Sequence, residues 1–413
     1  MPLARRRFLA LAAALPWTLA RAAPTTPHDA RRNLEDFDVL WRTIDTGYAY
    51  FDGAHASWKR ARQACRPKAA AAKTRAELVL ALGQALDFLH DDHATLSEDA
   101  PASSRRVPAD ADLWARWQDG NATVTAVRAF SGADVAGLHP GHVVTKVDGQ
   151  PIDRLVRERL RALGATGADA MDWALRHELA GPRDGRLRLV VRDAREAKLV
   201  NIERGPAKPA NGPPIIARRM GEDRDVAYIR IRNVLGDPQL PEQFDAALDY
   251  LQDTRALIFD LRETQDGGVR ASSEAILARF VAQPTPWQAR EAPGGKRVVD
   301  TISPRGTGRY PGRVVVLVDR WTAAEGEALA AGLEAAAHAT LVGTPMAGLR
   351  GITKEVKLPR SGIVARFPAE RSFHVNGTPR ERIRPAVEVN LAAPSGGPGD
   401  PILYQALKLT ERR

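Results

Sequence analysis

The pattern of apolar and polar positions changes twice along the chain, and its first part is helical. From Leu34 and Phe37 onward, residues 28–100 carry apolar side chains at steps of three and four, the spacing of amphipathic helices. Thr74, followed three residues later by Glu77, forms a capping-box pattern that predicts the start of one of these helices. We therefore expect a helical domain over residues 28–100.

The pattern then becomes that of a β-rich unit over residues 110–204. Apolar residues alternate with polar ones at 122–127 and at 187–191, which predicts two strands. Helical spacing recurs near 155–163 and 171–179. We therefore expect a second domain that combines strands with two helices.

A segment rich in proline and glycine, residues 205–215, has the composition of a linker. Beyond it, residues 216–413 alternate short strands with single helices, a pattern typical of right-handed β-α-β crossovers and a mostly parallel sheet. A hairpin is predicted within 353–367. The expected fold class is therefore α/β, in a multi-domain α+β chain with a β-α-β core. The expected core strands are 227–234, 256–261, 313–318 and 340–342, and the expected helices are 242–251, 273–281 and the segment after 324.

The first 22 residues have the pattern of a signal peptide. Three arginines at 5–7 precede an apolar stretch at 10–19 and a small-x-small cleavage site at 20–22. The apolar stretch is too short for a membrane span and contains Pro16. The Arg-Arg-x-Phe-Leu run resembles a twin-arginine export signal. We expect an exported protein, periplasmic or extracellular, without a stable membrane span.

The charge balance argues against a nucleic-acid partner. The chain carries 60 basic and 50 acidic side chains, a formal charge of +10, and four of the basic residues lie in the leader. No basic run is interleaved with aromatic residues, as nucleic-acid binding favours. Cys65 is the only cysteine, so no intramolecular disulfide can form, and its neighbours predict a buried, unreactive thiol on a helix.

Two histidines and two aspartates stand together at residues 90–93, where the helical domain ends. His90 and His93 could share a helical face as metal ligands, but the sequence offers no third convergent ligand. We therefore expect no metal, and no cofactor is expected elsewhere. A solvated helix end is an alternative interpretation of this motif.

The most informative segment is a sharp turn at residues 321–327, between a β-branched strand at 314–319 and a helix that starts near Glu327. A strand that turns directly into a helix displays its turn residues above the sheet, and the first helical N–H groups point outward as donors to an anion. A nucleophile is expected in such a turn. The residue in that place is Ala324, which has no nucleophilic atom.

This turn resembles the nucleophile turn of the C-terminal processing (tail-specific) serine peptidases, whose pattern is Thr-x-Ser-x-[Gly/Ala]-Glu. Thr322, Gly326 and Glu327 match in register, and Ala324 stands where the family has its serine. A methyl group can neither lose a proton nor attack a carbonyl carbon, so the resemblance predicts that proteolysis is lost or much reduced. Thr322 could replace the nucleophile, but its hydroxyl is better explained as a cap of the following helix.

A second match supplies an expected oxyanion hole. Residues 260–268 follow the family pattern Asp-Leu-Arg-x-x-x-x-Gly-Gly. Two adjacent glycines let the backbone approach a substrate and aim N–H groups at it. The resemblance implies that the donors are the backbone N–H groups of Gly267, Gly268 and Glu325. An ordinary strand-end turn is the alternative.

The resemblance also indicates a catalytic base. The turn at residues 342–348 matches the family, but Leu349 stands where its bacterial processing branch has a lysine base. In the branch related to the tricorn core protease, the base is a histidine at the end of the helical domain, and His93 falls on that position. Glu381 lies in a further matching segment, where it could orient the base, bind the sheet edge or pair with Arg380 at the surface.

Residues 133–152 resemble the core of a PDZ domain, with His142 in place of the usual aspartate. PDZ domains bind peptides by adding a strand to an exposed sheet edge. A β-rich domain without a ligand is the alternative, because no carboxylate-binding loop is evident. The peptide-binding residues implied by the resemblance are Gly137, Leu138, Gly141 and Val143.

These resemblances cover most of the chain and imply a helical domain, a PDZ-like domain and a mostly parallel, crotonase-like peptidase core. They imply an exported homologue of the tail-specific peptidases that binds peptides, unfolded proteins or protein C-termini. One alternative is an active peptidase with a rearranged nucleophile, such as a water activated by His93. Another is a carrier of a small apolar ligand, because the retinoid-binding modules of the vertebrate interphotoreceptor matrix are related to this family. The sequence sets no oligomeric state.

Overall fold

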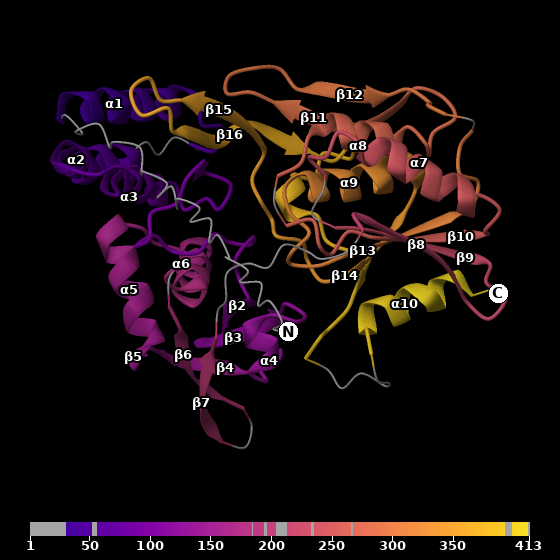
Figure 1. Cartoon of the computed structure of the whole chain (residues 1–413), viewed down its shortest axis with the longest axis horizontal. Coiled ribbons are helices and arrows are strands. Elements are labelled where there is room, and N and C mark those ends of the chain that lie inside the picture. Colours follow the sequence, from indigo (N-terminus) through magenta and orange to yellow (C-terminus); the bar gives the residue numbers. More distant parts are fainter. Residues whose placement is uncertain are drawn as a thin grey trace, which may run out of the picture.

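The computed structural model describes residues 30–51, 56–183, 185–193, 196–203, 213–232, 235–265, 267–306, 308–392 and 399–411. The predicted signal peptide, residues 1–22, lies outside the described residues, as does most of the predicted linker. Figure 1 shows helices at the start of the chain, a mixed unit below them and a sheet with helices on both faces beside them. The architecture is mixed α/β, as the hydrophobic pattern predicts.

The predicted helical start is confirmed. Helix α3 begins where the capping pattern predicts it, because Thr74 accepts a hydrogen bond from the backbone N–H of Glu77. Cys65 is buried on the second helix, which agrees with an unreactive thiol. The elements of this part are α1 (Ala30–Gly47), α2 (Ala56–Ala71), α3 (Arg75–Leu86) and the short η1 (Asp87–Leu89).

The middle unit is an antiparallel sheet in the order β2-β3-β4-β6-β7, with the short β5 beside β4. The two predicted strands correspond to β3 and β6, and the other four strands, β2, β4, β5 and β7, lie outside the predicted set. Its strands are β2 (Leu113–Gln118), β3 (Asn121–Val127), β4 (Val143–Val147), β5 (Gln150–Pro151), β6 (Leu187–Arg192) and β7 (Ala197–Ile202). Its helices are α4 (Gly132–Val135), α5 (Ile152–Leu163) and α6 (Ala168–Ala180).

The second half of the chain forms the predicted, mostly parallel sheet, which we call the core. The strand order is β17-β14-β13-β10-β9-β8, and only β8 pairs antiparallel to its neighbour within this described sheet. The strands are β8 (Ile215–Met220), β9 (Val226–Ile231), β10 (Ala256–Asp260), β13 (Arg313–Val318), β14 (Thr340–Gly343) and β17 (Val387–Glu388).

Alternate residues of these strands face two helical layers. Leu257 and Val316 belong to the apolar cluster that contains α7 (Leu240–Leu251), α8 (Arg270–Leu277) and α9 (Glu325–Ala337). Ile258 and Val315 pack instead against α10 (Pro401–Thr410). Figure 1 shows α10 on the opposite side of the sheet from α7, α8 and α9. The sheet is therefore covered on both faces, as a parallel sheet requires.

A hairpin from the core crosses to the helical start. Strands β15 (Ile352–Lys357) and β16 (Val364–Phe373) form the predicted hairpin, and β16 also pairs with β1 (Thr95–Leu96). Phe367 of β16 is buried in the same apolar cluster as the first helices, and Figure 1 shows the hairpin beside α1. At its other end β16 pairs with β11 (Thr285–Glu291), which pairs with β12 (Val298–Ile302). A hairpin from the second half of the chain therefore packs against the helical start.

None of the helices in the described part of the chain combines the length and the apolar character that a membrane crossing demands.

Candidate active site

The turn that carries Ala324 joins β13 to α9. Ala324 has φ of 50° and ψ of −112°, in the left-handed half of backbone space that residues other than glycine rarely adopt. Its N–H donates to Glu327 Oε2 at 3.1 Å, and the N–H of Ala323 donates to the carbonyl oxygen of Thr264. These bonds stabilise a sharp strand-to-helix turn at the residue that the sequence singles out.

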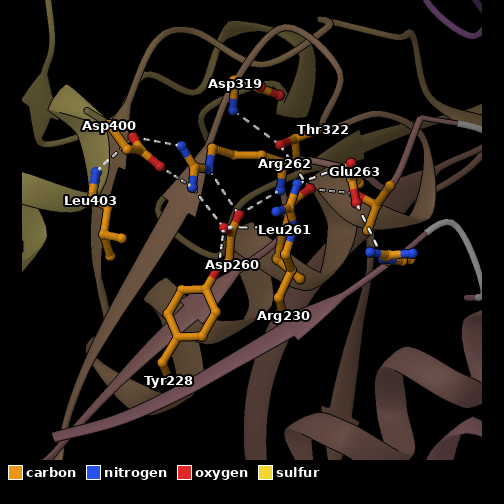
Figure 2. Close-up of polar contacts among 12 residues, drawn as sticks. Tyr228, Arg230, Asp260, Leu261, Arg262, Glu263, Asp319, Thr322, Asp400 and Leu403 are labelled. Carbon is orange, nitrogen blue, oxygen red and sulfur yellow. Dashed lines mark hydrogen bonds and ion pairs between the residues drawn. The ribbon is translucent and has the colours of Figure 1, made fainter. Parts of the chain in front are cut away.

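Thr322 does not cap α9, contrary to the sequence interpretation. Its hydroxyl donates to the carbonyl oxygen of Leu261 at 3.1 Å and accepts from the N–H of Asp319 at 3.0 Å. The side chain is fully buried, and Figure 2 shows its bonds at the ends of the strands. Thr322 therefore ties β10 to β13 below the turn, and its hydroxyl is committed to these two bonds.

A buried ionic cluster stabilises the end of β10. Arg262 Nε and Nη2 donate to the two carboxylate oxygens of Asp260 at 2.9 and 2.7 Å, and Tyr228 donates to the same carboxylate at 2.7 Å. Although burial raises the pKa of Asp260, the bonds and charge of Arg262 hold it below its ordinary value. Arg262 also bonds to Asp400, which caps α10, and Figure 2 shows Arg262 between the two carboxylates. This cluster fixes the strand end from which the glycine turn departs.

The glycine turn lies against the start of α9. Gly267 and Gly268 have φ of 65° and 105°. A Cβ atom on Gly268 would lie 2.4 Å from Cβ of Glu325, so only glycine allows this approach. The structure therefore brings together Gly267, Gly268 and Glu325, the three residues predicted to supply oxyanion donors.

Glu327 links the Ala324 turn to the turn after β14. Its carboxylate is fully buried and accepts from the N–H groups of Ala324 at 3.1 Å, Gly348 at 2.8 Å and Leu349 at 3.1 Å. Burial raises the pKa of Glu327 to about 7. The family pattern includes this glutamate, but the sequence does not reveal what it binds.

Glu327 is expected to make stability depend on pH. A carboxyl group whose pKa rises on folding contributes stability that is fully present below its ordinary pKa of 4.5 and is lost as the pH rises through its folded value of about 7. The free energy of unfolding of the unaltered chain, relative to Glu327→Gln, should therefore fall across that interval. Urea unfolding of both proteins over this pH range measures the difference. A difference that is constant or rises with pH would contradict the assignment.

His93 is held as a neutral imidazole. Its Nδ1 lies 2.6 Å from the carbonyl oxygen of Arg350, which can only accept, so Nδ1 carries the proton and Nε2 keeps a free lone pair. Burial, followed by the charge of Arg380, lowers the pKa of His93 to about 4. Arg350 directly follows Leu349, whose N–H binds Glu327. A short chain of bonds thus connects His93 with the Ala324 turn.

One sequence interpretation paired Glu381 with Arg380 at the surface. The structure contradicts it. Arg380 is only 4% exposed and donates to the carbonyl oxygens of Leu349 and Gly351. Glu381 accepts from the hydroxyl of Tyr50 at 3.5 Å. The orienting bond to His93 comes from a backbone carbonyl and not from Glu381. Arg380, whose charge lowers the pKa of both Glu327 and His93, is a residue that no motif indicated.

The aspartates of the His-Asp motif are bonded within the fold, so the motif is not a solvated helix end. Asp92 accepts from His177 Nε2 at 2.8 Å and from Arg176 at 3.2 Å, both on α6. Asp91 accepts from the hydroxyl of Tyr48 at 2.7 Å. Both carboxylates are buried. Among the described residues, no group of His, Cys, Asp and Glu side chains is arranged to bind a metal ion. The motif therefore ties the helical start to the middle unit.

The residues predicted to bind peptide through the PDZ-like unit do not lie on an open edge of its sheet. Gly137, Leu138 and Gly141 form the connection between α4 and β4, and Leu138 is buried. Val143 pairs with Thr123 of β3 and with Arg192 of β6. Strand addition at Val143 is therefore impossible, because both of its edges are occupied. Within the described sheet the edge strands are β2 and β7.

A cavity of about 800 Å³ lies where the helical start, the middle unit and the core meet. Its wall includes Trp114 and Arg116 of edge strand β2, as well as Glu327 and Glu381 of the core. It therefore adjoins the glutamate that holds the Ala324 turn. No sequence pattern indicates this cavity, because its walls come from three distant segments.

Comparison with known proteins agrees with this architecture. Residues 225–389 match the model of peptidase family S41, and residues 29–87 match that of the tricorn protease C1 domain. No curated protein sequence matches the chain.

Solved structures share the fold at low sequence identity. Mature CPAF is 16% identical, with 87% of this chain and 92% of that chain covered and a TM-score of 0.58. The photosystem II D1 C-terminal processing protease is 17% identical, with 87% and 93% covered and a TM-score of 0.53. A putative peptidase from Parabacteroides merdae is 16% identical, with 92% and 96% covered and a TM-score of 0.51.

These matches define the class as the serine peptidases, which hydrolyse peptide bonds. The substrates of such proteins are peptides or proteins. Within this class, residues 225–389 match peptidase family S41, and the structures that share the fold include a C-terminal processing protease.

Proposed function

We propose that this protein is an exported member of family S41 that binds peptides or protein C-termini and has lost most or all of its hydrolytic activity. The observation that carries the proposal is the conformation of Ala324. A positive φ on a residue other than glycine is retained only where the surroundings impose it. In a serine peptidase this geometry presents a hydroxyl, and here it presents a methyl group.

The neighbours of Ala324 support the same proposal. Gly268 packs on Glu325 beside the turn, so the backbone donors proposed for an oxyanion hole lie next to Ala324. His93 has the tautomer that a general base requires, with Nε2 free to accept a proton. A site that keeps these parts can still bind a peptide while it lacks the atom that attacks it.

The remaining parts of the chain have roles consistent with peptide binding. We assign residues 28–100 to a helical domain, 110–204 to a PDZ-like domain and 216–413 to a crotonase-like core. The leader at residues 1–22 would direct export to the periplasm or the cell exterior. Peptide addition in the middle unit is best assigned to edge strand β2, whose residues line the cavity.

The binding of peptide without turnover is the expected result for the unaltered chain. A fluorescent, unfolded model protein should bind saturably in an anisotropy titration, and mass spectrometry of the same sample should detect no new termini. The reason is that recognition uses backbone donors and cavity walls, whereas cleavage needs a nucleophile.

Two results would contradict this proposal. Absence of saturable binding would exclude a peptide-binding role. Cleavage by the unaltered chain, lost in His93→Ala, would favour the alternative of an active peptidase with a water or another nucleophile.

A further inference from the structure

We propose that the cavity between the middle unit and the core selects peptide segments that carry acidic side chains. This inference rests on the proposed function, because it names the substrate class of the same site. It starts from three arginines on the cavity wall, Arg320, Arg382 and Arg384, which we call the arginine group.

Within the described residues, the arginine group has no ion-pair partner. Arg320 follows β13, and its Nη1 donates to the carbonyl oxygen of Met346 at 3.0 Å. In the described part of the chain, no carboxylate oxygen lies within 4.0 Å of a guanidinium nitrogen of these three residues. Burial, and then the positive charges of Arg116, Arg176 and Arg384, lower the pKa of Arg320, and only Glu388 acts appreciably against them. An anion that enters would relieve this repulsion.

Most carboxylates on the cavity wall already have partners. Asp172 accepts from Arg116 at 3.0 Å and from the N–H of Trp117 at 2.9 Å. Asp92 accepts from Arg176 and His177. Glu327 accepts from three backbone N–H groups. These carboxylates are therefore already bonded within the fold, and they do not neutralise the arginine group.

The wall carries three further acidic side chains, Asp91, Asp169 and Glu381, and Asp91 accepts from the hydroxyl of Tyr48. Asp169 and Glu381 line the cavity, but neither is among the charges that act most strongly on Arg320. Glu381 accepts instead from the hydroxyl of Tyr50. Other arginines also line the wall, and of these Arg116, Arg176 and Arg350 lie near carboxylates of the chain. The arginine group is therefore the part of the wall where an acidic side chain of a bound peptide would bind.

Trp114 holds part of this surface rigid. The guanidinium of Arg320 lies 5.2 Å from the centre of the Trp114 ring, and that of Arg176 lies 4.8 Å from it. Stacking on an aromatic ring restricts a long side chain before any ligand arrives, so less entropy is lost on binding. The planar fork of an arginine then suits a carboxylate, which it can bind through two parallel hydrogen bonds. Trp114 belongs to edge strand β2, so an extended peptide along this strand would pass the arginine group.

The test compares two peptides on the full chain. Both are acetylated at the N-terminus and amidated at the C-terminus, so neither has a terminal carboxylate. They are identical except that two central glutamates in one are glutamines in the other. We expect the acidic peptide to bind about tenfold more tightly at low ionic strength, which corresponds to about 1.4 kcal/mol. This preference should weaken as salt is added.

Substitutions locate the preference. Arg320→Gln should remove most of it. The double change Arg382→Gln and Arg384→Gln concerns exposed side chains and should also remove it without affecting folding. Arg309→Gln, at an exposed arginine that does not line the cavity, should leave it unchanged.

Each contrary outcome has a distinct meaning. Equal affinity for the two peptides overturns the acidic preference and leaves the proposed function in place. A preference that survives both arginine changes overturns its assignment to this cavity. Failure of both peptides, and of an unfolded protein, to bind overturns the proposed function together with this inference.

Discussion

Ala324→Ser is expected to raise the rate of peptide cleavage about 10³-fold or more above that of the unaltered chain. The new hydroxyl would occupy a turn whose backbone already has the strained conformation. On the proposed assignment, the backbone of Gly267, Gly268 and Glu325 supplies the oxyanion donors and His93 Nε2 accepts the proton of the new hydroxyl. Removing the serine from a triad protease costs about 10⁶-fold, so even partial restoration should be measurable. The measurement is the initial rate of cleavage of an unfolded protein substrate by the two proteins.

His93 supplies the control for this gain. His93→Ala in the Ala324→Ser background should abolish most of the new activity. Because the pKa of His93 is lowered to about 4, the imidazole stays neutral well below neutral pH, and the rate should persist into mildly acidic buffer. Equal cleavage by the unaltered chain and by Ala324→Ser would place the nucleophile elsewhere.

Asp260→Asn is expected to lower the free energy of unfolding by about 3 kcal/mol. Asp260 is fully buried and compensates the charge of Arg262, which is itself mostly buried. An amide removes that charge and turns an N–H group toward the guanidinium, so a buried cation loses its main partner. Asp400, the other partner of Arg262, remains and limits the loss. Urea unfolding measures the difference.

An exposed pair of the same chemistry is the matched control. Asp253 pairs with Arg219 at 2.6 Å, and the aspartate side chain is 69% exposed. Asp253→Asn should change the free energy of unfolding much less than Asp260→Asn does, because water screens exposed pairs. Equal effects of the two substitutions would mean that the cluster around Asp260 does not stabilise the core.

The parts of the site that sequence could predict are those that local backbone chemistry determines. The strand before Ala324 is β-branched and the helix after it is rich in alanine, so the turn between them is forced to be sharp. The paired glycines predict a close approach of two backbone segments, and Gly268 packs on Glu325. The parallel sheet followed from the alternation of strands and helices in the second half of the chain.

The parts that sequence could not predict depend on side chains from distant segments. The hydroxyl of Thr322 could have capped α9, and only the packing of β10 against β13 directs it to Leu261. The position of Arg380 in sequence suggests a surface residue, yet the chain buries it against carbonyl oxygens after β14. The cavity draws its walls from three parts of the chain. Such contacts arise from tertiary packing, which no local pattern encodes.

The most direct test of the central claim is covalent labelling of Ala324→Ser with a fluorophosphonate, a reagent that modifies activated serines. We expect stoichiometric labelling on the peptide that contains position 324, loss of that label in the His93→Ala background, and no labelling of the unaltered chain. Labelling of the unaltered chain at any other serine, or failure of a folded Ala324→Ser protein to react, would contradict the claim that this site lacks only its nucleophile.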